Sequence, residues 1–144
     1  MNGAVVVDAS LVVKWLVPEV NSDKADTLAR SWAQSGVRTV APFLMPVEVT
    51  NALYQRVVRG EASIATAIAG LERLLDSGIE LQEQYETHVR AIELAYQLRQ
   101  GAAYDAHYLA LAELLDCELW TADERFYRVA SGGFPRVKWL GAFT

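Results

Sequence analysis

Cysteine, histidine and long apolar segments are scarce in this sequence, and each scarcity excludes a class of protein. The 144 residues include one cysteine, Cys117, and two histidines, His88 and His107. A single cysteine excludes an internal disulfide framework and is typical of the reducing cytoplasm. A zinc site built from histidine and cysteine is not expected either. No apolar run approaches the ~20 residues that a membrane-spanning helix requires, so we expect no membrane association.

Positive charge is also in short supply. The chain has 13 Lys and Arg against 18 Asp and Glu, a formal net charge of −5 and a pI near 5.0. This balance argues against a protein that coats nucleic acid through a general basic surface. The acidic net charge still allows an enzyme that binds the phosphate of its substrate through a metal ion. Because histidine and cysteine are so few, we expect any such metal to be a hard cation held by carboxylates.

Apolar residues, by contrast, are plentiful for a chain of this length. They make up 52% of the sequence, and the mean hydropathy is +0.11. A chain of 144 residues forms one core, so we expect a single domain over residues 1–144. The apolar excess indicates either a well-filled core or a surface that is buried against a partner.

Short apolar runs alternate with helical patterns along the chain, which predicts an α/β domain with a mostly parallel sheet. We expect strands at 5–7, 37–41, 78–81, 117–121 and 136–140, and helices at 11–17, 21–36, 44–59, 61–76, 83–100, 104–116 and 125–130. Ser10 is expected to cap the first helix, and Pro18 to end it.

Two of the expected strands are followed by an aspartate. Asp8 ends the run 5–7, and Asp123 follows the run 117–121. If the two strands are parallel neighbours, both carboxylates lie at the edge of the sheet where ligands bind in such folds. Ordinary turn chemistry explains either aspartate alone equally well. A hydroxyl two residues from each, Ser10 and Thr121, favours a site.

Two further acids lie on expected helices. Glu48 shares one side of its helix with Ala52, Gln55 and Arg59, and an exposed glutamate is the simpler interpretation. Asp105 lies just off an apolar helical stripe that includes Tyr108, and a carboxylate there is less hydrated than on an open surface. Its simpler interpretation is a first-turn acid that stabilises the helix dipole.

The four acids together predict a metal centre, on an argument about charge. Four carboxylates within several ångströms repel one another and shift their pKa values upward unless a divalent cation neutralises them. Mg²⁺ or Mn²⁺ prefers oxygen ligands and can bind substrate phosphate. One such ion, or two about 4 Å apart, activates water and stabilises charge on a phosphodiester.

Four segments of the chain resemble the PIN-domain family, especially its VapC-type toxin ribonucleases. They are 6–19 (VVDASLVVKWLVPE), 41–53 (which contains VEVTNAL), 104–112 (YDAHYLALA) and 119–123 (LWTAD), and they occur in the order that the family has. The resemblance implies a PIN-like three-layer α/β/α sandwich with a mostly parallel central sheet of about five strands. It also implies an endoribonuclease that depends on Mg²⁺ or Mn²⁺.

The resemblance also assigns roles to residues. Its acidic quartet of catalytic and metal-binding residues maps onto Asp8, Glu48, Asp105 and Asp123. Glu124 adjoins the last of these and is an alternative fourth ligand. Ser10 and Thr121 would orient the carboxylates or metal-bound waters. Asn51 is assigned to packing or to the same supporting shell.

Partners follow from the resemblance as well. VapC toxins are inhibited by an antitoxin that lays a helical segment over the site, and they commonly form homodimers, or hetero-tetramers and larger assemblies with antitoxin. Candidate surfaces are the apolar residues Leu11, Trp15, Leu16, Leu53, Tyr54 and Val57, for which ordinary core packing is the simpler interpretation. Candidate RNA contacts are Lys14, Arg56, Arg59 and Arg125, for which simple solvation is the alternative. The acidic net charge favours selection of a particular folded or exposed RNA site.

Other functions fit the strand-end aspartate less well. A receiver-type signalling domain requires an acidic pair at the first strand, and a haloacid-dehalogenase-type phosphatase requires Asp-x-Asp where this chain has Asp8-Ala9-Ser10. A catalytically silent PIN-like binding module remains an alternative, although all four acids are present. A PIN-domain RNA-processing nuclease without a toxin role is a second alternative.

Overall fold

Five short strands form one sheet in which every neighbouring pair runs parallel. They are β1 (Ala4–Val7), β2 (Arg38–Pro42), β3 (Glu80–Gln82), β4 (Glu118–Thr121) and β5 (Val137–Trp139). Their order in this computed structural model, which describes residues 3–144, is β3-β2-β1-β4-β5. Residues 1 and 2 of the predicted domain lie outside the described residues. The predicted parallel sheet of about five strands is confirmed.

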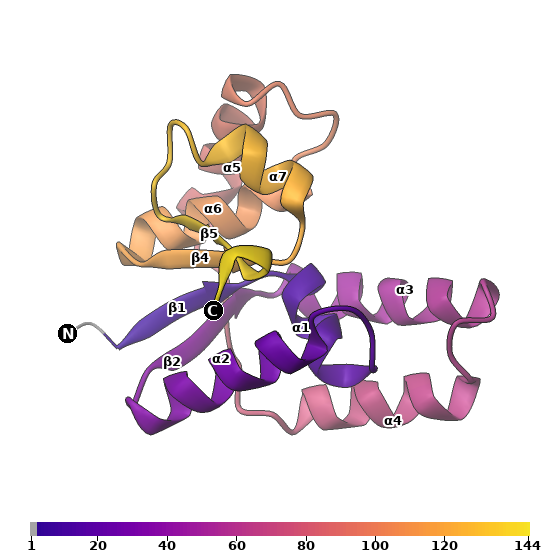
Figure 1. Ribbon diagram of the computed structural model, residues 1–144. Coiled ribbons are helices and arrows are strands. Elements are labelled where there is room, and N and C mark those ends of the chain that lie inside the picture. Colours follow the sequence, from indigo (N-terminus) through magenta and orange to yellow (C-terminus); the bar gives the residue numbers. More distant parts are fainter. Residues whose placement is uncertain (1–2) are drawn as a thin grey trace.

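Among residues 3–144, seven helices cover the two faces of this sheet (Figure 1). One face carries α1 (Ala9–Leu16), α2 (Ser22–Gln34), α3 (Leu44–Val58) and α4 (Ile64–Leu75), and the other carries α5 (Tyr85–Gln97), α6 (Tyr104–Leu115) and α7 (Glu124–Ala130). A 3-10 turn, Leu140–Ala142, follows β5. Helices α3 and α4 form a hairpin that projects beyond the sheet (Figure 1). The predicted α/β/α sandwich is therefore confirmed.

The central strand β1 is buried on both faces, as its run of three valines predicted. Val5, Val6 and Val7 are nearly inaccessible to solvent and belong to one continuous apolar cluster with α1 and α6. β-Branched side chains suit a strand that is packed on both sides. Among residues 3–144, no helix is long and apolar enough to cross a membrane.

Local backbone chemistry moves several predicted boundaries. β3 begins at Glu80 and not at residue 78, because Gly78 adopts a left-handed turn with φ of 80°. Helix α5 ends at Gln97 and not at residue 100, because Arg99 also has a positive φ, of 55°. The predicted cap of the first helix is wrong. Asp8 caps α1 and accepts a bond of 3.0 Å from the backbone N–H of Leu11.

The apolar residues considered as partner surfaces are mostly core. Leu11, Leu16 and Leu53 are buried, so the simpler interpretation is right for them. Trp15 is half-buried and donates a hydrogen bond of 2.7 Å from its indole N–H to the carbonyl of Ala25. Of this set, Tyr54 is exposed.

Candidate metal centre

The sheet brings Asp8 and Asp123 to the same edge. Val7 of β1 pairs with Trp120 of β4, and each strand then ends within a few residues of its aspartate. Two parallel neighbours with the same polarity present their carboxyl ends together, at the position where open α/β sheets bind ligands. The neighbour relation that the sequence left open is confirmed.

Asp8 is almost fully buried, and its charge is poorly compensated. Its Oδ1 accepts hydrogen bonds from the Ser10 hydroxyl at 2.7 Å and from the Leu11 N–H at 3.0 Å. Burial raises the pKa of Asp8 to about 7. Hydrogen bonds from Thr121, Ser10 and Leu11 lower that pKa only in part, and the charge of Asp105 raises it further. A group of this kind favours either a proton or a cation.

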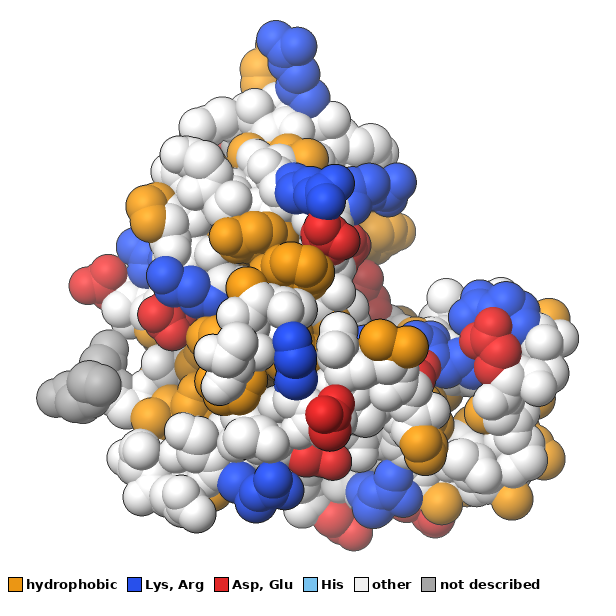
Figure 2. Space-filling view, viewed as in Figure 1, with side chains coloured by type: hydrophobic (Ala, Val, Ile, Leu, Met, Phe, Trp, Pro, Cys, Tyr) orange, Lys and Arg blue, Asp and Glu red, His pale blue; other side chains and the backbone are white. Residues whose placement is uncertain are grey.

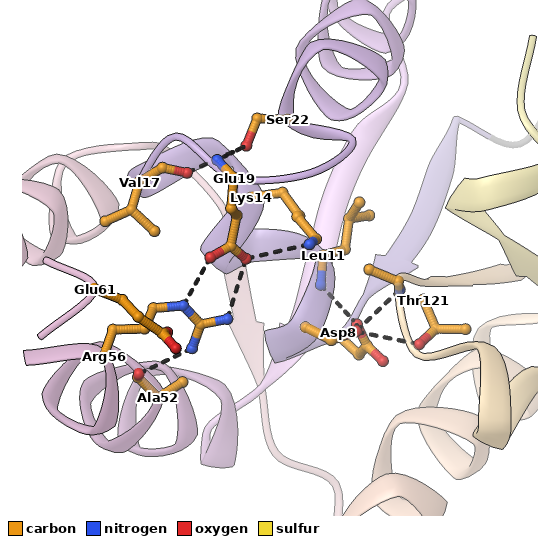
Figure 3. A network of polar contacts seen from close by, with 12 residues as sticks. Asp8, Leu11, Lys14, Val17, Glu19, Ser22, Ala52, Arg56, Glu61 and Thr121 are labelled. Carbon is orange, nitrogen blue, oxygen red and sulfur yellow. Dashed lines mark hydrogen bonds and ion pairs between the residues drawn. The ribbon is translucent and has the colours of Figure 1, made fainter. Parts of the chain in front are cut away.

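Ser10 and Thr121 join Asp8 to the end of β4, and Figure 3 shows Thr121 beside Asp8. The two hydroxyl oxygens are 3.2 Å apart, and Ser10 also accepts a bond of 2.9 Å from the N–H of Ala122. Thr121 accepts a bond of 3.0 Å from the N–H of Asp123. The hydroxyls of Ser10 and Thr121 therefore fix the position of Asp8 relative to Asp123.

Asp105 lies in the first turn of α6, half-buried beside the other acids. Within the described residues its carboxylate accepts no hydrogen bond from another side chain or from the backbone. Burial raises the pKa of Asp105 to about 6, the charges of Asp123 and Glu48 add to the rise, and the charge of Arg125 opposes it. The three acids and the arginine thus act on one another across this edge of the sheet.

Glu48 is held by a residue that sequence reasoning assigned to the core. The hydroxyl of Tyr108, on α6, donates a hydrogen bond of 2.6 Å to Oε1 of Glu48, on α3. Burial, this bond and the neighbouring acids raise the pKa of the Tyr108 phenol far above its usual range, so it stays a donor. A tyrosine in an apolar stripe needs a partner for its hydroxyl, and that requirement was the available signal.

Asp123 also caps a helix. Its Oδ1 accepts bonds of 3.0 and 3.2 Å from the N–H groups of Arg125 and Phe126 at the start of α7. Glu124, the alternative fourth ligand, pairs with Arg128 one turn along the same helix. The geometry therefore ties Asp123 to the sheet edge and Glu124 to its own helix.

The donor chemistry of this edge fits a hard divalent cation. The four carboxylates come from four separate segments of the chain, and the charge of Asp105 interacts with those of Asp8, Glu48 and Asp123. Asp8 and Asp105 have pKa values raised toward neutrality. Within residues 3–144, however, no three Asp, Glu, His or Cys side chains lie close enough to hold one ion together. Mg²⁺ keeps several waters and binds through one or two carboxylates, so it tolerates such spacing.

The remaining predicted residues fall into two groups. Asn51 is exposed, and in the described part of the chain its side chain makes no hydrogen bond, so its role in packing or in the supporting shell stays a prediction. Lys14 and Arg56 both pair with Glu19, at 3.2 and 2.8 Å (Figure 3), while Arg59 pairs with Glu61 at 3.1 Å. Contact with RNA stays a prediction for these cations. Arg125 lies with Asp105 and Asp123.

A pocket of about 300 Å³ lies beside two of the four acids and is lined by Asp105, Asp123 and Arg125. Arg99 also lines it, and the sequence did not indicate this residue because it follows the end of α5. A larger pocket, of about 520 Å³, lies between α7 and β5 and is lined by none of the four acids. Figure 2 shows the molecule indented beside the projecting hairpin, with acidic side chains in the wall of the indentation and basic ones on both sides.

Comparison with known proteins identifies the family. Residues 5–132 match the PIN domain. The chain is 38% identical to Ribonuclease VapC1 of Mycobacterium tuberculosis (strain CDC 1551 / Oshkosh) over 96 residues, which are 66% of this chain and 68% of that protein. Its fold is similar to PAE2754 from Pyrobaculum aerophilum (TM-score 0.67, 23% identity, 92% of this chain and 83% of that chain). It is equally similar to a toxin–antitoxin complex from Klebsiella pneumoniae (TM-score 0.67, 16% identity, 94% and 97%). This chain belongs to the PIN domain family.

Proposed function

We propose that this protein is a VapC-type toxin, an endoribonuclease that hydrolyses RNA phosphodiester bonds with Mg²⁺ or Mn²⁺ at Asp8, Glu48, Asp105 and Asp123. The observation that carries the proposal is the buried Asp8 carboxylate at the end of the central strand, beside three further acids. The relationship to a ribonuclease of the VapC group supports the choice of RNA as substrate.

The protein's own side chains prepare this site for a cation and for a phosphodiester. Asp8 and Asp105 would hold the ion, and each is short of positive charge in its absence. Tyr108 fixes the carboxylate of Glu48, while Ser10 and Thr121 fix Asp8 relative to Asp123. When bound, the ion supplies an activated water and stabilises negative charge on the phosphate.

Cleavage of RNA by the purified protein tests the proposal. We expect activity with Mg²⁺ or Mn²⁺, none in excess EDTA, and none in Asp8→Asn or Asp105→Asn variants that keep a native circular dichroism spectrum. Asp26→Asn, at an exposed acid on α2, is the matched control and should keep full activity. Undiminished cleavage in EDTA, or in either site variant, would overturn the metal–carboxylate mechanism.

An antitoxin is the proposed protein partner, and α3 offers it an apolar line beside the site. Phe43, Val47, Tyr54 and Val58 recur at helical spacing and are all more than half exposed, and Val47 adjoins Glu48 in sequence. An inhibitor that lies along this line covers the acidic site as well. Expression should arrest growth, and the neighbouring gene should relieve the arrest. A Tyr54→Asp variant that still arrests growth should escape this relief.

A second copy of the chain is the other proposed partner. Tyr85, Val89, Ile92 and Tyr96 form a stripe along the outer side of α5, and each is at least 58% exposed. Apolar positions at this spacing suit packing against the same stripe of a twofold-related copy.

We further propose that residues 1–144 act as one PIN domain in the cytoplasm, where the single buried thiol of Cys117 stays reduced.

A further inference from the structure

Two arginines differ from all the others in the described part of the chain. The side chains of Arg30, Arg38, Arg56, Arg59, Arg73, Arg90, Arg128 and Arg136 each donate to a carboxylate, a hydroxyl or a carbonyl. Within residues 3–144, the guanidinium groups of Arg99 and Arg125 have no hydrogen bond or ion pair. Both are exposed and both line the pocket that contains Asp105 and Asp123.

Arg99 occupies a backbone position that favours glycine. It follows the last residues of α5 with φ of 55°, and its loop is closed by a bond of 2.8 Å from the N–H of Gln100 to the carbonyl of Ala95. The matching positions after α2 and α3 are Gly36 and Gly60, with φ of 71° and 75°. A side chain in the left-handed region destabilises the fold relative to glycine. Arginine at this position therefore indicates a role for the guanidinium.

The setting of the two guanidinium groups suits a phosphate. They line a pocket of about 300 Å³ together with Asp105 and Asp123, yet within residues 3–144 neither forms an ion pair with these acids. In Figure 2, basic side chains gather over the part of the molecule that carries α7, above the indentation. A planar guanidinium binds a phosphate through two parallel hydrogen bonds, and single-stranded RNA offers one phosphate per nucleotide.

We propose that Arg99 and Arg125 form a clamp for a backbone phosphate of single-stranded RNA next to the bond that is cut. The clamp deepens the proposed function and rests on it for the nature of the ligand. It offsets the repulsion between an acidic chain and RNA at one place, which is how a protein of net charge −5 recruits a polyanion. Arg99 is then a positioning residue that contributes to binding and not to the chemical step.

Substitutions at Arg99 separate this role from a structural one. Arg99→Gly should raise the thermal unfolding midpoint, because glycine relieves the left-handed backbone. The same variant should raise KM for a single-stranded RNA about tenfold with kcat unchanged, since one charge-assisted contact is lost. The slope of log KM against log salt should fall by about 0.7, the value for one phosphate on a single strand. Arg99→Lys should recover part of the loss.

Arg30→Gln is the matched control, because it removes one exposed positive charge on α2 and should leave both KM and the salt slope unchanged. Equal KM and salt slope in Arg99→Gly and wild type would overturn the clamp while the nuclease stands. Binding of a labelled single-stranded RNA in EDTA, followed by fluorescence anisotropy, covers the opposite case. If wild type does not cleave RNA, Arg99→Gly should still bind the labelled RNA more weakly than wild type and with a smaller dependence on salt. RNA binding equal to that of wild type would overturn the clamp.

Discussion

Asp8 combines two functions in one side chain, and only one of them was predictable. Its place after a buried strand pointed to a site at the sheet edge. Its role as the cap of α1 was hidden, because Ser10 is also a good capping residue and lies closer to the apolar run of the helix. The structure uses Ser10 as a donor to Asp8 at 2.7 Å, so the two residues act together.

The raised pKa of Asp8 predicts how the metal-free protein responds to pH. The Asp8 carboxyl has a pKa of about 7 in the folded state, whereas in the unfolded chain its pKa is near the ordinary value of 3.8. The folded state therefore binds more protons between these values, and its stability falls as pH rises from about 4 to about 7. The pKa rises by about three units, and each unit corresponds to about 1.4 kcal/mol. We therefore expect the free energy of unfolding of Asp8→Asn to exceed that of wild type by roughly 4 kcal/mol at pH 8.

Urea unfolding in EDTA at pH 4 and pH 8 measures this difference. The difference in free energy of unfolding between Asp8→Asn and wild type should be small at pH 4 and larger at pH 8. Added Mg²⁺ should narrow it, because a bound cation stabilises the wild-type carboxylate. A gap that is independent of pH would contradict a pKa of about 7 for this residue.

Tyr108 was predicted as an apolar helix residue, and its hydroxyl was the missed signal. The ring is buried as expected, but its oxygen reaches Glu48 on a helix that lies 60 residues away in sequence. Periodicity identifies which side of a helix is buried, and it carries no information about which polar atom lies opposite. Long-range polar pairs of this kind depend on the assembled fold.

Tyr108→Phe should remove the hydrogen bond that holds the Glu48 carboxylate, with little change to the fold. We expect kcat/KM for RNA to fall about tenfold and stability to fall by about 1 kcal/mol, the usual net value of one buried hydrogen bond. Tyr127→Phe is the control, because Tyr127 stacks on Trp139 and its hydroxyl makes no hydrogen bond within residues 3–144. Equal activity in the two variants would show that Glu48 does not need its tyrosine.

At the scale of elements, one ion-pair cluster joins the loop after α1 to α3. Glu19 receives two bonds from Arg56, of 2.8 and 3.0 Å, and pairs with Lys14 at 3.2 Å (Figure 3). Burial alone would raise the pKa of Glu19, but the bonds and charges of Arg56 and Lys14 outweigh burial and lower it. The carboxylate is thus stabilised by its partners, and the last turn of α3 is tied to the loop after α1.

A double-mutant cycle on Glu19 and Arg56 measures this tie. Both side chains are about one-fifth exposed, so we expect a coupling free energy of about 1–2 kcal/mol, above the usual surface pair. The variants are Glu19→Gln, Arg56→Gln and the double variant, compared by urea unfolding. The pair Arg59 and Glu61, which is half exposed, is the control and should couple by less than about 0.5 kcal/mol. Equal coupling in the two pairs would rule out a special role for the less exposed pair, Glu19 and Arg56.

For the whole molecule, the alternation of strands and helices was sufficient to predict the class of fold. The strand order was not predictable by the same reasoning, because β1 pairs with β4 across more than 100 residues. The acidic site depends on that pairing, since Asp8 and Asp123 meet only if the two strands are neighbours. Arg99 was missed for a different reason, because its position beside Asp105 follows from the local course of the loop between α5 and α6.

The stripe on α5 predicts the state of the molecule in solution. Ile92 is 69% exposed in the middle of four apolar side chains, and a lysine there would place like charges together at a twofold axis. We expect sedimentation equilibrium to give a dimer for wild type and a monomer for Ile92→Lys, with native circular dichroism for both. Ile64→Lys, at an equally apolar and 58% exposed position on α4, should remain a dimer. Dissociation by both substitutions would locate the contact elsewhere, and a monomeric wild type would rule out self-association through α5.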